Sequence, residues 1–277
     1  MKRIWFDIEI GTNPDASTAL LFALLHPEIE VVGISLSGSK KTQPSRHGEA
    51  LEVLKYINKN TIPIFLGEDI TPEIINDQNI EHTIISGPLT NISKLFLDDA
   101  ILGKLHINAG CFSKMQYRGK EITQESNALK DLEATRIVLT QAHHATISSL
   151  EASSLLALDD KTKSKLEDKH MFLKKRYDGY QEYLSTKYNE KNNRMIFNAL
   201  LPICNILNTV SINKENIEFK IQADGTFLPT YKLTNITNPI EKFIEQEKEL
   251  TPVPTVCHEV IRAVNPSKIF EELLRVI

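Results

Sequence analysis

The sequence contains few cysteines, only three among 277 residues. Cys111, Cys204 and Cys257 are odd in number and far apart, which fits neither a disulfide framework nor a zinc spacing. No apolar run is long enough to span a bilayer, and the first residues show no secretion signal. We therefore expect buried, reduced thiols in a cytoplasmic protein that is not inserted in a membrane.

The sequence also lacks a strong charge of either sign, because the formal net charge is −4. A basic surface for nucleic acid or for an anionic membrane is therefore not expected. Hydrophobic residues make up 41% of the chain and charged residues 25%, which is typical of a globular protein with a sizeable core.

Short apolar runs alternate with helical patterns through the first half of the chain. The expected strands span residues 4–10, 31–36, 62–66, 83–86, 105–109 and 145–150, and the expected helices 19–25, 48–57 and 132–139. This rhythm predicts a parallel sheet with helices on both faces. Ligands of such sheets bind beyond the carboxyl ends of the strands, so the loops after Ile10, Leu36, Ser86 and Ala109 are candidate sites.

The second half has longer helical patterns at residues 164–188, 195–207 and 267–277. An alternating run at 217–223, followed by Asp224-Gly225, predicts a strand that enters a hairpin. The length suits one α/β domain over residues 1–277, with a mainly parallel central sheet flanked by helices.

Three carboxylates, Asp7, Glu9 and Asp15, lie on or just after the first expected strand. Carboxylates at the carboxyl end of a strand can bind a divalent cation or a polyhydroxylated ligand. Capping of the following helix by Asp15 and its neighbours is the alternative. The spacing alone leaves both interpretations open.

Three segments resemble the nucleoside hydrolase family, in the order in which that family has them. They are FDIEIGTNPDASTALLFALLHPEIEVVGIS at the N-terminus, SGPLTNIS at 86–93 and ESNALKDLEATRIV at 125–138. Weaker similarity occurs at HINAGCF, at MIFNALLPICNIL and in the hairpin at 217–233. The resemblance covers almost the whole chain and implies the Rossmann-like fold of that family.

Members of this family cleave the N-glycosidic bond of ribonucleosides through a transition state that resembles an oxocarbenium ion. In them a calcium ion holds two ribose hydroxyls and the attacking water, and an aspartate acts as base. The resemblance therefore implies a small nucleoside or ribosyl ligand as partner, and a homo-oligomeric assembly.

The resemblance assigns roles to residues near the first strand. Asp7 matches the first family aspartate, and Glu9 stands where the family has the metal-binding aspartate proposed as base. Asp15 matches an aspartate that binds a ribose hydroxyl, and Thr90 matches a threonine whose carbonyl binds calcium. Glu9 and Asp15 are thus the catalytic candidates, and Asp7, Glu9 and Thr90 are the residual metal candidates.

Further positions match the ribose-binding residues of the family. Glu125 and Asn127 match two of them directly. Asn108 stands where the family has a methionine beside the sugar, and Ser39 replaces an asparagine. We expect these four side chains to contact the ligand.

Two calcium-ligand positions have no carboxylate in this chain. Ala16 stands at one of them, and Asn198-Ala199 replaces a His-Asp pair that supplies a proton donor and the last ligand. Calcium needs six to eight oxygen ligands, so no metal cofactor is expected, and Asn198 becomes a candidate ligand contact. A shift of the alignment by one residue would instead make Asp15 the metal ligand.

Other histidines do not restore that pair. Aligning His258-Glu259 with it leaves the hairpin after residue 210 without a counterpart. His82, His106 and the pair His143-His144 lie in or beside expected strands and are interpreted as structural or solvent-facing.

The sequence leaves three interpretations of function. The chain is a divergent N-ribosyl hydrolase, a ribosyl-binding or regulatory protein without catalysis, or a subunit that acts through oligomerisation. The two alanines favour the second and third, and the retained Glu125 and Asn127 favour a ligand.

Overall fold

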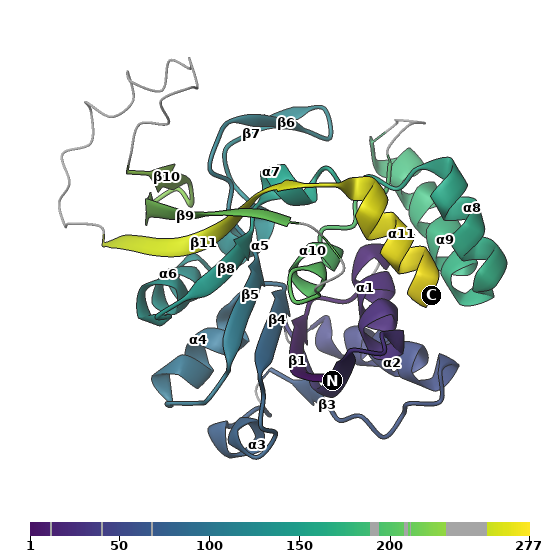
Figure 1. The fold of residues 1–277 in the computed structure, drawn as a ribbon, viewed down its shortest axis with the longest axis horizontal. Helices are drawn as coiled ribbons and strands as arrows, with labels where there is room; N and C mark the ends of the chain where they lie inside the picture. Colours follow the sequence, from purple (N-terminus) through teal and green to yellow (C-terminus); the bar gives the residue numbers. More distant parts are fainter. Residues whose placement is uncertain are drawn as a thin grey trace.

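The structure is a computed structural model that describes residues 1–11, 13–39, 41–67, 69–188, 194–207, 210, 212–230 and 254–277. In this part of the chain nine strands form one sheet (Figure 1). In spatial order they are β10 (Phe227–Pro229), β9 (Ile212–Ile221), β11 (Thr255–Val264), β8 (Ala145–Ser148), β5 (Lys104–Asn108), β4 (His82–Ser86), β1 (Lys2–Ile8), β2 (Ile29–Leu36) and β3 (Ile64–Leu66).

The strands from β11 to β3 pair in parallel, and only β9 and β10 run antiparallel to their neighbours. The mainly parallel sheet predicted from the sequence is therefore confirmed. A separate hairpin joins β6 (Met115–Tyr117) to β7 (Lys120–Ile122).

Helices connect and cover these strands. They are α1 (Pro14–Leu25), α2 (Gln43–Tyr56), α3 (Pro72–Asn76), α4 (Thr90–Leu97), α5 (Ser126–Lys130), α6 (Leu132–Gln141), α7 (Leu150–Ser153), α8 (Asp160–Lys169), α9 (Met171–Tyr188), α10 (Leu200–Cys204) and α11 (Pro266–Val276).

Side chains of β1 alternate between two hydrophobic cores. Ile4, Phe6 and Ile8 pack in a core that includes buried residues of α1, α9, α10 and α11. Trp5 packs in the other core, with α4 and α6. Figure 1 shows α4 and α6 on one side of the sheet, and α1 and α10 on the other. Because Asp7 follows the same alternation as Trp5, its side chain lies on the α4 face.

Two helices differ from the sequence expectation. The pattern at 164–188 is broken at His170, whose extended backbone ends α8 before α9 begins. The pattern at 195–207 yields helix only at α10, because Ile196 forms a β-bridge with Ala157. The chain at 195–197 is therefore extended where its apolar spacing predicts a helix.

The described helices include none that is long and apolar enough to cross a membrane.

Candidate ligand site at the carboxyl ends of the strands

A cavity of about 380 Å³ lies beyond the carboxyl ends of β1, β4 and β5, and we call it the inner cavity. Its wall includes Glu9 after β1, Ser86 at the end of β4 and Asn108 at the end of β5. Residues at the start of α2 close one side. The volume falls in the range of roughly 300–1,000 Å³ that is usual for small-molecule sites.

Both carboxylate oxygens of Glu9 are paired with cations. Oε1 accepts a hydrogen bond of 2.7 Å from Arg46 of α2, and Oε2 is paired with Lys130 of α5. The Glu9 side chain is 18% exposed and that of Arg46 is 14% exposed, whereas Lys130 is 46% exposed. Two positive charges from two different helices therefore converge on one carboxylate in the inner cavity.

The position of Arg46 is fixed by the loop that follows β2. Its second guanidinium nitrogen donates to the carbonyl of Ser37 at 2.5 Å. Gly38 has φ of +109°, and a Cβ at that residue would lie 2.1 Å from the Arg46 guanidinium. The positive φ favours glycine here, and a larger residue would also press on the end of the Arg46 side chain, so the loop suits the position of the arginine beside Glu9.

Asp15 is 6% exposed and joins α1 to α10. Its two oxygens accept from the backbone N–H of Ala199 at 3.1 and 3.2 Å. Burial raises the pKa of Asp15 to about 8, although the Ala199 N–H and the charge of Arg118 act in the opposite direction. Asn13, rather than Asp15, caps α1, because its side chain accepts from the Asp15 N–H.

The two alanines at the expected calcium-ligand positions lie beside Asp15. Ala16 lines the inner cavity, and Ala199 is buried at the start of α10. Asn198 also lines the cavity, with its amide nitrogen 3.4 Å from the Tyr117 hydroxyl. The Asn198 Oδ1 is buried with no hydrogen-bond partner, so it is available to a ligand hydroxyl.

Glu125, Asn127 and Asn108 form the opposite wall of the inner cavity. Glu125 caps α5, since its oxygens accept from the N–H groups of Asn127 at 2.9 Å and Ala128 at 3.0 Å. Asn127 lines the inner cavity and donates from Nδ2 to the carbonyl of Asn108 at 3.0 Å. Burial raises the pKa of Glu125. These bonds hold the side chains of Glu125 and Asn127 in fixed orientations.

Three other predicted site residues do not line the inner cavity. Asp7 is fully buried, and its Oδ2 accepts from Ser35 at 2.6 Å and from Asn91 of α4 at 2.7 Å. Burial raises the pKa of Asp7 to about 6. Thr90 donates to Asp131 at 2.6 Å. Ser39 is exposed, with its hydroxyl 3.1 Å from that of Thr42.

The residues present do not fit calcium coordination. The Glu9 carboxylate is engaged by two cations, and Ala16 and Ala199 carry no side-chain oxygen. In the described ranges, no group of three or more His, Cys, Asp or Glu side chains is placed to hold a metal ion. A divalent cation at Glu9 would meet the positive charges of Arg46 and Lys130, and the two alanines would offer it no side-chain oxygen.

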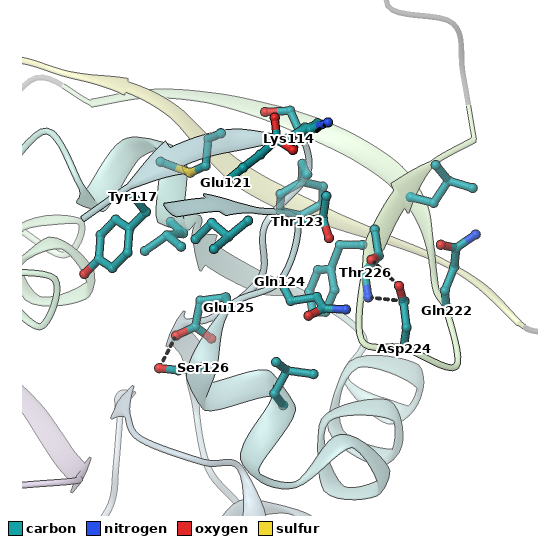
Figure 2. Close-up of a pocket in the computed structure, with 18 of the residues that line it drawn as sticks. Lys114, Tyr117, Glu121, Thr123, Gln124, Glu125, Ser126, Gln222, Asp224 and Thr226 are labelled. Atoms are coloured by element: carbon teal, nitrogen blue, oxygen red, sulfur yellow. Dashed lines mark hydrogen bonds and ion pairs between the residues drawn. The ribbon is translucent and has the colours of Figure 1, made fainter. Parts of the chain in front are cut away.

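A larger cavity of about 1100 Å³ adjoins the first, and we call it the outer cavity. The two share Glu125, Ser126 and Asn198. Figure 2 shows Tyr117 and Glu121 on the β6–β7 hairpin and Asp224 and Thr226 at the β9–β10 turn, on either side of this space. Apolar Phe112, Phe227 and Leu228 also line it. A ligand could thus extend from the polar inner cavity into a wider, partly apolar one.

The histidines identified in the sequence lie outside both cavities. His82 and His106 contact each other at 2.9 Å, and His143 and His144 are exposed. His258 is a buried residue of β11, where it contacts the carbonyl of Leu139 at 2.7 Å. Its position in a strand that pairs with β8 and β9 gives it a structural role.

The sequence did not indicate Arg46 or Lys130. Lys130 lies within the segment 125–138 that resembles the family, five residues after Glu125. Arg46 follows the expected second strand, in a loop that was a candidate site. A single basic residue in a helical pattern ordinarily indicates a solvated face, so only the directions of α2 and α5 reveal these contacts.

No protein-family model and no curated protein sequence matches the chain. Solved structures do match over nearly the full length. A plant nucleoside hydrolase is 16% identical with a TM-score of 0.78, and covers 99% of this chain and 98% of its own. A purine-preferring ribonucleoside hydrolase from Gardnerella vaginalis is 15% identical with a TM-score of 0.66, and the match covers 99% of this chain and 97% of that hydrolase. An inosine–guanosine nucleoside hydrolase is 12% identical with a TM-score of 0.73, and the match covers 100% of this chain and 99% of that hydrolase. The chain therefore has the fold of the nucleoside hydrolases.

Proposed function

We propose that the inner cavity binds the ribosyl group of a small ligand without calcium, and that the chain does not carry out the metal-dependent hydrolysis of its structural neighbours. The observation that carries the proposal is the double ion pair on Glu9. A carboxylate held by two cations is poorly suited both to binding a metal ion and to accepting a proton from water.

The polar wall of the inner cavity supports the ribosyl part of the proposal. Sugar hydroxyls both donate and accept hydrogen bonds, and Glu125, Asn127 and Asn198 offer oriented acceptors there. The unpartnered Oδ1 of Asn198 would gain the hydrogen bond that it lacks. A protonated Asp15 could donate to a hydroxyl, which an ionised carboxylate cannot do.

An active N-ribosyl hydrolase is the second candidate. The fold favours it, and so does the retention of Glu9, Asp15, Glu125 and Asn127 around one cavity. It requires that ligand binding release Glu9 from its two cations.

Titration calorimetry with D-ribose tests the proposed function. We expect binding that is unchanged by a chelator or by millimolar calcium. Asn198→Ala should weaken it by roughly tenfold, the usual effect of one lost hydrogen bond of 1–1.5 kcal/mol. The fold should tolerate this change, because the described contacts of Asn198 include only one long side-chain hydrogen bond, to Tyr117.

Asn216→Ala is the matched control, since Asn216 is exposed on β9 and lies outside both cavities. Its ribose affinity should equal that of the unchanged protein. Binding that appears only when calcium is added, or no binding at millimolar ribose, contradicts the proposal.

A further inference from the structure

Two cations converge on one carboxylate in the inner cavity. Arg46 and Lys130 contribute the two positive charges, and both are paired with Glu9, which balances one of them. The other two carboxylates of the wall, Asp15 and Glu125, are buried and accept hydrogen bonds from backbone N–H groups. Around Glu9 there is therefore one cation more than a neutral sugar requires.

The geometry of the two cations suits an anion in the cavity. They come from different helices, α2 and α5, and both contact the Glu9 carboxylate. The guanidinium is fixed by Ser37 and Gly38, so little side-chain entropy remains to be lost on binding. Lys130 is 46% exposed, and its ammonium has three donors, of which Glu9 takes one.

Hydroxyl groups accompany the cations. Ser126 lies between Glu125 and Asn127 on the inner cavity wall, and Ser45 lies one residue before Arg46 on its rim. A phosphate monoester carries a charge of about −1.5 to −2 at neutral pH and three acceptor oxygens, which matches two convergent cations with adjacent hydroxyls.

We infer that the ligand of the inner cavity is a phosphorylated ribosyl compound, whose phosphate is bound by Arg46 and Lys130 while the sugar lies against Glu125, Asn127 and Asn198. This inference rests on the proposed function and adds the class of ligand. The two cations donate hydrogen bonds to the phosphate, and these replace part of the hydrogen bonds that they donate to Glu9. No covalent step is involved.

Calorimetry with ribose 5-phosphate, D-ribose and inorganic phosphate, run side by side, tests the inference. Ribose 5-phosphate should bind at least about tenfold more tightly than ribose, the effect of one or two charge-assisted hydrogen bonds. Lys130→Met should remove most of this gain, measured as the ratio of the ribose 5-phosphate affinity to the ribose affinity of the same variant. Arg46→Met should act in the same direction.

Lys94→Met is the control, because Lys94 is exposed on α4 and lies outside both cavities. Lys94→Met should retain the full affinity difference between ribose 5-phosphate and ribose. In the unchanged protein this difference should shrink at high salt, since partly exposed charges are screened.

The outcomes separate the two proposals. If ribose binds and its 5-phosphate binds no better, the inference is overturned and the proposed function stands. If neither sugar binds, the proposed function fails. If inorganic phosphate binds as tightly as ribose 5-phosphate and ribose does not compete, the cations form a plain anion site and the ribosyl assignment is overturned.

Discussion

Purified protein should release ribose from inosine and uridine at a rate at least about a thousandfold below an ordinary turnover of roughly 10 per second. The expectation concerns two positions that the family resemblance singles out. Glu9 stands where the family has its base, and both of its oxygens are paired with Arg46 and Lys130. Asn198 stands where the resemblance places a histidine that could protonate the leaving group, and general acid catalysis by itself contributes roughly 10²–10⁴-fold.

A reducing-sugar assay at millimolar nucleoside, with and without calcium, measures this rate. Glu9→Gln is the control, because it removes the base position while keeping a side chain of similar size. A residual rate that Glu9→Gln leaves unchanged comes from a contaminant. Turnover at 1 per second or faster, abolished by Glu9→Gln, would contradict the expectation and restore the hydrolase.

Asp15→Asn should make the protein more stable than the unchanged chain at high pH, and the advantage should disappear toward pH 4. Burial raises the pKa of Asp15 from an ordinary value of 3.8 to about 8 in the folded protein. Between these values the folded state binds the extra proton, so unfolding becomes easier as pH rises through this window. Each pH unit within this window lowers the free energy of unfolding by up to about 1.4 kcal/mol.

Asparagine keeps an oxygen that can accept from the Ala199 N–H and does not ionise. We expect the difference in unfolding free energy between variant and unchanged protein to grow by about 1–3 kcal/mol from pH 5 to pH 8.5. Denaturant unfolding curves of both proteins at several pH values measure this difference in unfolding free energy.

Asp98→Asn supplies the matched control, since Asp98 is an exposed residue at the end of α4. The difference in unfolding free energy between Asp98→Asn and the unchanged protein should not grow with pH in this way. A difference that stays constant for Asp15→Asn across this range would show that Asp15 is ionised in the folded protein.

The parallel part of the fold was predictable because its strands are continuous apolar runs, as in β1 and β2, buried on both faces. β11 was not predicted. Its inward positions include His258, which is 2% exposed and satisfied by Leu139 and Ala145, so its sequence lacks a clean alternation. At 195–197 the pairing of Ile196 with Ala157 overrides an apolar spacing that also fits a helix.

The candidate site shows a similar limit. The carboxyl ends of parallel strands share one edge, so Glu9 and Asn108 were expected near each other, and both line the inner cavity. Their binding roles stay predictions. The pairing of Arg46 and Lys130 with Glu9 depends on the directions of two helices and on Gly38, which local sequence patterns do not specify.

A crystal structure of the protein soaked with ribose and calcium tests the central claim most directly, because it examines sugar and metal together. The account predicts ribose in the inner cavity against Glu125, Asn127 and Asn198, with Arg46 and Lys130 still bound to Glu9 and no ion beside it. A seven- or eight-coordinate calcium ion at Glu9 and Asp15, with Arg46 and Lys130 displaced, would contradict it.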